Sequence, residues 1–361
     1  MAQGIEQSEL SYSEEYEYRE QPPPDIVVFN ELRSCADLYR LYEKKQLDVD
    51  PYFQRGVVWD GPDQTRFIDS LIKQLPIPSM CFGFDYKKSK WMVIDGLQRM
   101  SSIIRFFDKT KNWKFSKLKD IDPRLAGADV RLFRDDTSEL HVYYERVENL
   151  TLPITVLRCD FSELRHLDYL FKIFHRLNAG GMRLNNQEIR NCIYSGPFNI
   201  LLIELDRSAE WQTFLSIVHG KKERFRSVEL VLRFFAFYED RESYKGNLPR
   251  FLNDFMATRR WTSDTLLLEM RLKFKKTLDV IVNKLIVLID GKKFGFSQAE
   301  ALLVAIASNI SSVSNFTSEE LQQRYQKFLN IPLLSTTALS ADISRTDSVK
   351  QRIKQAIESF S

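Results

Sequence analysis

Residues 90–107 read KWMVIDGLQRMSSIIRFF, and this stretch predicts a strand, a tight bend and a helix in immediate succession. From Lys90 to Ile94 the apolar and polar residues follow the pattern of a strand. From Met100 to Phe107 the apolar residues recur at helical spacing. Gly96 lies between the two patterns, where a residue without a Cβ lets the backbone bend sharply. We therefore expect a strand that turns directly into a helix.

The sequence on either side extends this pattern into a mixed module. Met80–Tyr86 and Lys90–Ile94 flank a short polar turn and predict a β-hairpin. Leu152–Leu157 predicts a further strand. The helices expected in this region are a Ser34-capped helix to about Lys45, Arg66–Gln74, Met100–Phe107, and one that begins at the pair Asp160…Glu163 and runs toward Phe174. We expect an α+β domain over residues 26–190.

Helical periodicity dominates after Ile193. The expected helices are Phe198–Leu205, Ser227–Tyr238, Thr265–Ile289, Gln298–Ser308, Glu319–Phe328 and Val349–Ile357. Besides Asp160…Glu163, three pairs predict capping boxes: Asn185…Glu188, Ser297…Glu300 and Thr317…Glu320. Residues 191–361 are therefore expected to form an all-helical domain. Residues 1–25, acidic and ending in a run of prolines, are expected to form a flexible tail.

Composition narrows the class of protein. A chain of 361 residues with 43% hydrophobic and 28% charged residues fits a globular protein of two domains. No apolar run reaches the length of a membrane span, and the first residues do not resemble a secretory signal. The four cysteines are scattered, as in a protein of the reducing cytoplasm. With only four histidines and no zinc-binding spacing, metal hydrolases and HNH-type nucleases are disfavoured.

The charge distribution is compatible with nucleic acid or a nucleotide as partner. Net charge is +3, and residues 1–25 contain seven acidic residues and one arginine, so the remainder is more basic than the whole chain. The candidate DNA-facing residues are Lys221, Lys222, Arg224 and Arg226. The alternative is that these four belong to a solvated loop.

The bend after Ile94 has the features of a phosphate site. The first amides of a helix are unpaired and carry partial positive charge, which favours an anion. Gln98 and Arg99 lie in that first turn, and a guanidinium can bind the same anion through two hydrogen bonds. Asp95 can hold Mg²⁺, bind a ribose hydroxyl or orient Arg99. The alternative is that Asp95 caps the helix and Arg99 is a surface charge.

Two further polar clusters are candidates for the same site. Gln54 and Arg55 supply donors, with Tyr52 and Trp59 as faces on which a base can stack. The alternative is that these aromatic rings fill the core.

The third cluster, residues 174–191, contains Asn178 and the pair Gly180-Gly181. The two glycines permit backbone conformations closed to other residues. The capping box at Asn185 offers a purely structural explanation of the same cluster.

Taken in order, these clusters resemble the N-terminal domain family of GmrSD-type modification-dependent restriction endonucleases. The matching elements are Phe53-Gln54-Arg55 with Trp59, the segments at residues 68–72 and 76–78, Ile94–Arg99, Phe174–Asn191 and Glu229–Phe237. The resemblance covers about residues 30–260 and implies a fold similar to ParB and sulfiredoxin. One departure is Leu97, which stands where the commonest form of the DGQQR element has its first glutamine.

The family implies a role for these residues. Its DGQQR element, here Asp95–Arg99, is linked to nucleotide binding and hydrolysis, which assigns catalysis to Asp95, Gln98 and Arg99. Gln54, Arg55 and Gly96, with Asn178, Gly180 and Gly181, would then complete the nucleotide site. The cofactor implied is a nucleoside triphosphate with Mg²⁺, the metal being held by Asp95. Many relatives carry a C-terminal HNH-like nuclease domain with histidine-rich motifs. Here the only histidine beyond residue 190 is His219.

Together with the residues above, the resemblance implies a cytoplasmic nucleotide-binding protein of bacterial DNA restriction and antiviral defence, with nucleoside-triphosphate hydrolysis as its expected activity. Phosphoryl transfer needs little beyond positioning and charge neutralisation. The alternatives are a non-catalytic DNA-binding adaptor that recruits a separate nuclease subunit and, less favoured, a DNA nickase. DNA is the expected partner, a membrane is not, and a homo-oligomer stays open.

Overall fold

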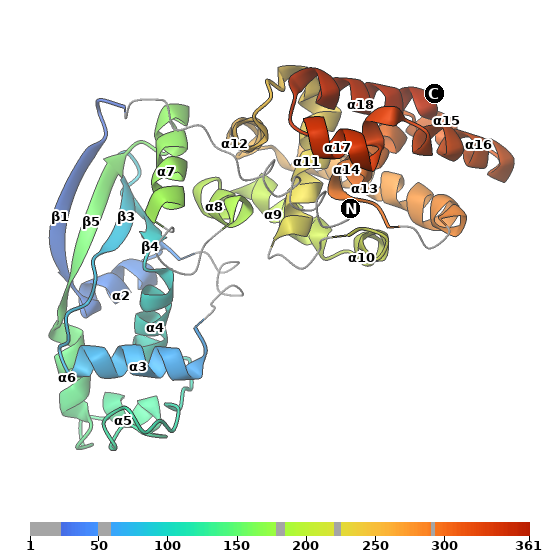
Figure 1. Cartoon of the computed structure of the whole chain (residues 1–361). Helices are drawn as coiled ribbons and strands as arrows, with labels where there is room; N and C mark the ends of the chain where they lie inside the picture. Colours follow the sequence, from blue (N-terminus) through green and yellow to red (C-terminus); the bar gives the residue numbers. More distant parts are fainter. Residues whose placement is uncertain (1–22, 50–58, 178–184, 220–224, 290–292) are drawn as a thin grey trace. The chain divides into compact units, whose positions relative to one another are not determined.

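The computed structural model describes residues 23–49, 59–177, 185–219, 225–289 and 293–361. Within these residues the chain divides into two compact units. We call residues 23–49 and 59–177 the α+β unit, and the described residues from 185 to 361 the helical unit (Figure 1). The mixed architecture followed by a helical part confirms the fold class expected from the sequence.

A five-stranded sheet organises the α+β unit. Its strands are β1 (Val27–Ser34), β2 (Leu47–Asp48), β3 (Met80–Asp85), β4 (Lys90–Asp95) and β5 (Thr151–Cys159). They lie in the order β1-β5-β3-β4-β2. The pairs β1–β5 and β3–β4 are antiparallel, whereas β3–β5 and β2–β4 are parallel. The predicted hairpin and the strand near residue 152 are confirmed, while β1 was not predicted.

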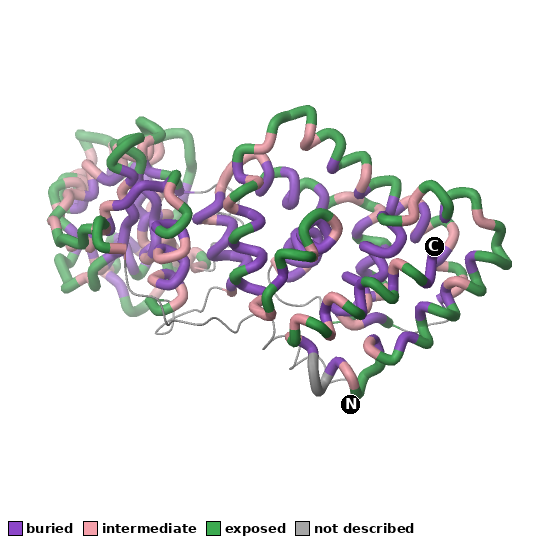
Figure 2. Tube along the Cα trace, turned by 90° about the horizontal axis from the view of Figure 1, so that it is seen from above, coloured by how far each residue is buried: buried purple, intermediate pink, exposed green. Residues whose placement is uncertain are grey.

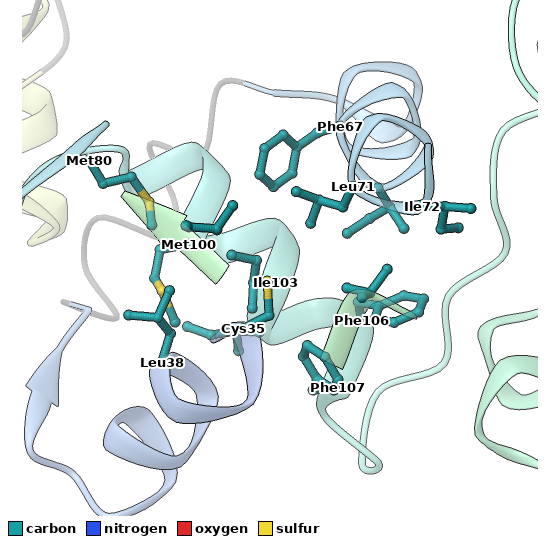
Figure 3. Close-up of a cluster of buried hydrophobic side chains, with 14 of the residues drawn as sticks. Cys35, Leu38, Phe67, Leu71, Ile72, Met80, Met100, Ile103, Phe106 and Phe107 are labelled. Atoms are coloured by element: carbon teal, nitrogen blue, oxygen red, sulfur yellow. The ribbon is translucent and has the colours of Figure 1, made fainter. Parts of the chain in front are cut away.

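Helices cover both faces of this sheet. They are α2 (Cys35–Glu43), α3 (Gly61–Ile72), α4 (Leu97–Phe107), α5 (Val130–Arg134), α6 (His141–Asn149) and α7 (Leu164–Leu177). Figure 3 shows how side chains of α2, α3 and α4 point toward one another and toward Met80 of β3. On the opposite face Gly83 faces Phe161, just before α7, at a distance that leaves little room for a side chain. The unit is thus layered as helices, sheet and helix.

Local chemistry explains where these helices begin. Ser34 accepts the backbone N–H of Asp37 at 3.0 Å and caps α2 as expected. Helix α3 begins five residues earlier than the expected Arg66, because Asp60 caps it and a proline follows in the first turn. The capping box expected at Asp160 is wrong. The Asp160 carboxylate accepts from the backbone and hydroxyl of Ser162, and α7 begins at Leu164.

The helical unit is built from α8 to α18. Its elements are α8 (Asn186–Ile193), α9 (Pro197–Asp206), α10 (Ala209–Leu215), α11 (Arg226–Asp240), η3 (Arg241–Ser243), α12 (Leu248–Arg259), α13 (Asp264–Val280), η4 (Ile281–Leu285), η5 (Ile286–Leu288), α14 (Phe296–Ser308), α15 (Ile310–Val313), α16 (Ser318–Leu329), η6 (Pro332–Leu334), α17 (Thr336–Asp342) and α18 (Thr346–Ser359). Five of the six predicted helices are present, and the one expected at Thr265–Ile289 is α-helical only to Val280 and continues as η4 and η5. The only strand-like pairing among the described residues of this unit is an isolated β-bridge between Val218 and Phe294.

Two of the other three predicted capping boxes form, at Asn185 with Glu188 and at Thr317 with Glu320. The third, at Ser297 and Glu300, is wrong. Helix α14 begins at Phe296, and the side-chain oxygen of Gln298 accepts the backbone N–H of Gly295. Glu300 is instead fully buried inside the helical unit. A carboxylate in that position needs cationic partners, which the sequence pattern did not reveal.

Those partners belong to a buried charge network that crosses the helical unit. Arg190 of α8 donates to Glu229 of α11 at 2.9 Å, and Arg233 donates to the same carboxylate at 2.8 Å. Arg233 lies 3.6 Å from Glu300, and Arg352 of α18 donates to Glu300 at 3.3 Å. Figure 2 shows the buried helices that run through this unit. The network ties the first, middle and last helices of the unit together.

The end of the α+β unit differs from the boundary expected at residues 190 and 191. That boundary falls inside α8, which packs against α11 and α12 of the helical unit. The expected acidic tail lies outside the described residues except at its end, where Asp25 receives a hydrogen bond from His166 at 3.1 Å. Among the described residues, no helix has the combination of length and apolar character that crossing a bilayer requires.

Candidate functional site

The candidate site is the corner between β4 and α4. Asp95 ends β4 next to Cys81 of β3, and the pairing slips by one residue at this point. Such a bulge changes the direction in which the strand presents its side chains. The carboxylate of Asp95 is 38% exposed, in contrast to the buried residues that precede it in β4. The corner therefore presents one carboxylate to solvent.

Gly96 makes the corner possible. Its φ of 97° lies in the left-handed region, which side chains disfavour. A Cβ at this position would come within 2.5 Å of Cγ of Met80, which is fully buried. No side chain caps the helix that follows, so the first turn of α4 lacks the usual Ser, Thr or Asp oxygen. An uncapped helix start of this kind is suited to an external anion.

Arg99 is held by the protein itself. Its Nη2 donates to the Asp95 carboxylate at 2.9 Å and to the carbonyl of Ser79 at 3.5 Å, and its Nη1 donates to the carbonyl of Pro78. The side chain is only 14% exposed. Burial lowers the pKa of Arg99, and the neighbouring carboxylate offsets part of that effect. Arg99 thus links the residues just before β3 to the first turn of α4, and it orients Asp95.

Gln98 links the same helix to a third segment. Its side-chain oxygen accepts the backbone N–H of Trp59 at 3.3 Å, and Gln64 of α3 donates to the carbonyl of Trp59 at 3.3 Å. The indole of Trp59 lies 5.6 Å from the ring of Phe67 and packs on the core. This position fits the core-filling alternative for Trp59 better than a stacking face for a base.

The structure brings together Asp95, Gly96, Gln98 and Arg99, with Trp59 beside them. The other expected members of the nucleotide site lie outside the described residues: Gln54, Arg55, Asn178, Gly180 and Gly181. Three of the four expected DNA-facing residues, Lys221, Lys222 and Arg224, lie outside them as well. Their roles stay predictions.

Arg226 occupies a different position from the exposed one expected for a DNA contact. It is 7% exposed at the start of α11, and its guanidinium lies 4.3 Å from the centre of the Phe296 ring. A buried guanidinium over an aromatic ring stabilises packing through a cation–π contact. Arg226 therefore contributes to the core of the helical unit.

The end of the third sequence cluster also has a structural role. Gln187 donates to Asn191 at 3.0 Å, and Arg190 donates to Asn253 of α12 at 2.8 Å. Gln187, Arg190 and Asn191 are all buried within the helical unit. Their dense polar pattern, which in sequence resembles a binding motif, here satisfies buried hydrogen-bonding groups.

The corner offers few ligands to a metal. Among the described residues, no group of three or more histidine, cysteine or acidic side chains is arranged to hold an ion. Mg²⁺ often binds to one or two carboxylates and takes its remaining ligands from phosphates and water. Asp95 fits that requirement as a single, partly exposed carboxylate, but it does not form a metal site by itself.

Comparison with known proteins agrees with the resemblance read from the motifs. Residues 36–195 match the model of the family described as GmrSD restriction endonuclease, N-terminal domain. The match spans fewer than half of the 361 residues, and it runs from α2 through α8. The segment is thus similar to domains of restriction endonucleases. No curated protein and no solved structure matches the chain.

The sequence did not reveal which backbone carbonyls accept hydrogen bonds from Arg99. The carbonyls of Pro78 and Ser79 lie just before β3, and the buried Met80 behind Gly96 is the first residue of that strand. The only available signal was the Pro76-Ile77-Pro78 segment, which marks an ordered, extended approach to a strand. Which residue it would meet depended on the pairing of β3 with β4.

Proposed function

We propose that this protein is a component of a DNA restriction and antiviral defence system whose α+β unit binds and hydrolyses a nucleoside triphosphate. The observation that carries the proposal is the uncapped start of α4 at Gly96, directly beside Asp95 and Arg99. The similarity of residues 36–195 to a restriction endonuclease domain supports the system. The ParB- and sulfiredoxin-like character of the fold is part of this proposal.

The geometry supports different roles for the three polar residues of the corner. Asp95 is the group that reaches solvent, so it would hold the Mg²⁺ of a bound nucleotide or orient water. Arg99 keeps that carboxylate in place, since it bonds to it directly. Gln98 fixes Trp59, four residues after Arg55. The phosphates would meet the first amides of α4.

A second candidate function is a DNA-binding adaptor without catalytic activity, which recruits a separate nuclease. One observation favours it. Arg99, expected to contact phosphate, already donates to Asp95, Pro78 and Ser79 and is largely buried. A phosphate would have to share this guanidinium with those three acceptors. A purely structural Arg99 is the arrangement that a non-catalytic domain would retain.

Nucleotide binding and phosphate release distinguish the two functions. The full-length chain is titrated with a slowly hydrolysed triphosphate analogue and Mg²⁺ by calorimetry, and phosphate release is followed with the four ribonucleoside triphosphates. We expect Asp95→Asn to lower turnover at least tenfold and Arg99→Ala to weaken binding at least tenfold, about 1.4 kcal/mol. Arg105→Ala, a half-buried arginine on the same helix, is the control and should bind within twofold of the native chain.

The opposite result is equally clear. If the native chain neither binds nor hydrolyses any of the four nucleotides, yet binds DNA with an affinity that falls steeply with salt, the hydrolase proposal is wrong and the adaptor is supported. Arg99→Ala should then leave DNA affinity within twofold.

A further inference from the structure

Strand β1 forms one edge of the sheet. It pairs with β5 along one side, and no other strand of the described residues pairs with its second side (Figure 1). An open edge presents a row of backbone donors and acceptors to which another strand can bind. The question is which chain supplies that strand.

The register identifies the backbone groups that point outward. The backbone N–H of Cys35, directly after β1, donates to the carbonyl of Leu150 at 3.0 Å. Because directions alternate along a strand, the odd-numbered residues of β1 bond to β5, and Val28, Asn30 and Leu32 point their N–H and C=O groups away from it. Leu32 lies opposite Pro153, which has no N–H to donate. Both observations therefore show that the even-numbered residues of β1 point their backbone N–H and C=O groups away from β5.

The side chains of β1 are apolar where an exposed edge usually carries charge. Val27, Val28, Phe29 and Leu32 are 46%, 56%, 38% and 69% exposed. The two charged residues of the strand, Glu31 and Arg33, pair with each other. Soluble proteins normally protect a free edge with lysine, proline or a bulge. An exposed apolar edge of this kind indicates a surface that is covered in the working protein.

We propose that β1 pairs with β1 of a second copy of this chain, antiparallel, with Asn30 opposite Asn30 of that copy. In this register Val28 lies opposite Leu32 of the second copy, and the same pair recurs on the other side of the twofold axis. Each outward N–H and C=O of Val28, Asn30 and Leu32 then meets an outward group of the second copy. The two sheets join into one continuous sheet across the dimer.

Side-chain complementarity selects this register. It brings two Val–Leu pairs together on one face, and it places the two copies of Phe29 at the diagonal separation of about 7–8 Å that aromatic rings can bridge. Other registers also pair outward groups with outward groups. The two nearest place Asn30 opposite Val28 or opposite Leu32, so neither contains a Val28–Leu32 pair. A register further along places Leu32 opposite Leu32. In that register Val28 lies opposite α2 rather than a strand, so its side chain stays exposed. The strand is therefore complementary to itself about Asn30.

The first test measures mass in solution. Sedimentation velocity of the full-length chain should show a dimer of the 42.5 kDa protomer at micromolar concentration. A charge at Val28 or Leu32 opposes the pairing, so Val28→Lys and Leu32→Lys should weaken the dimer at least tenfold with unchanged circular dichroism. Leu268→Lys is the matched control, since Leu268 is a leucine 55% exposed on α13, and it should remain dimeric.

A backbone variant separates pairing from simple hydrophobic contact. The N–H of Asn30 faces outward, so Asn30→Pro removes two hydrogen bonds of the dimer, one donated by each copy, and none of the β1–β5 ladder. Asn30→Ala keeps that N–H and loses only the bond from Thr155, at 2.9 Å, to the side chain. We expect the proline variant to be monomeric and the alanine variant dimeric. Two variants with the same affinity for self-association would contradict strand pairing.

Crosslinking tests the register. Asn30→Cys should form an intermolecular disulfide under mild oxidation, because directly opposite residues lie about 5.5 Å apart. Leu32→Cys should not, since the two copies of residue 32 are separated by four residues. The reverse pattern would overturn the register. A chain that remains monomeric at 100 μM would overturn the dimer, and a thiol at position 30 that resists labelling in that monomer would assign the edge to another segment of the same chain.

Discussion

The glycine at the β4–α4 corner gives the sharpest prediction about stability. Gly96 has φ of 97°, and the nearest atoms to an added Cβ would be Cγ, Sδ and Cβ of Met80 at 2.5, 2.9 and 3.0 Å. Met80 is fully buried, so its side chain cannot move into solvent. Gly96→Ala must therefore accept both an unfavourable backbone conformation and a steric conflict.

The two costs can be assigned magnitudes. The left-handed conformation costs a non-glycine residue about 1–2 kcal/mol, and overpacking a core costs about 1–3 kcal/mol. We expect Gly96→Ala to lower the free energy of unfolding of the α+β unit by about 2–5 kcal/mol. At a urea dependence of about 2 kcal/mol per M, the midpoint falls by about 1–2.5 M. Far-UV circular dichroism and tryptophan fluorescence, recorded together, follow the transition.

Two comparisons test the reasoning. Gly61→Ala, at the start of α3, adds a Cβ 3.0 Å from the hydroxyl of Ser116, which can rotate, so it should change stability by less than about 0.5 kcal/mol. In a Met80→Ala background the contacts with Cγ and Sδ are gone and only the 3.0 Å contact with Cβ of residue 80 is left, so Gly96→Ala should cost mainly the backbone part, about 1–2 kcal/mol. A cost below about 1 kcal/mol in the native background, or the same cost in both backgrounds, would refute this explanation.

Three further predictions concern a buried ion-pair network, the pH dependence of stability and the reactivity of the cysteine thiols. Glu229→Gln leaves two buried arginines without their shared carboxylate. Measured by urea unfolding, it should lower the free energy of unfolding by about 3–5 kcal/mol. The control Glu204→Gln removes a carboxylate from an exposed ion pair and should lower it by less than about 1 kcal/mol. Burial raises the pKa of Asp160, but hydrogen bonds from Lys87 and neighbouring groups outweigh it and hold the pKa at about 2. Because the folded pKa lies below the unfolded one, this stabilisation is present above about pH 4 and disappears toward pH 2. Lys87→Met should thus be less stable than the native chain at pH 6, and the free energies of unfolding of the two chains should converge toward pH 2. A difference between them that does not change with pH would contradict the assignment. With Ellman's reagent the native chain should show one fast thiol, Cys192, because the other three cysteines are buried with pKa values raised to about 12, and Cys192→Ser should remove the fast phase.

The features that sequence predicted correctly are those set by neighbouring residues. The bend at Gly96, the caps at Ser34 and Thr317 and the helices of the second half all depend on spacing within a few residues. Strand β1 was missed because its apolar residues do not alternate with polar ones. Helices α5 and α6 were missed because both are short and rich in charged residues.

By itself, the sequence determined the α+β and helical class, the strand–glycine–helix corner and the likeness of residues 36–195 to a restriction endonuclease domain. Only the tertiary structure decided which groups Arg99 binds, and that Glu300 is buried between two arginines instead of capping a helix. The reason is that a cap or a bend is fixed by atoms a few residues apart. The partner of a long charged side chain depends instead on which distant strand or helix packs beside it, and that choice depends on the burial of the whole core.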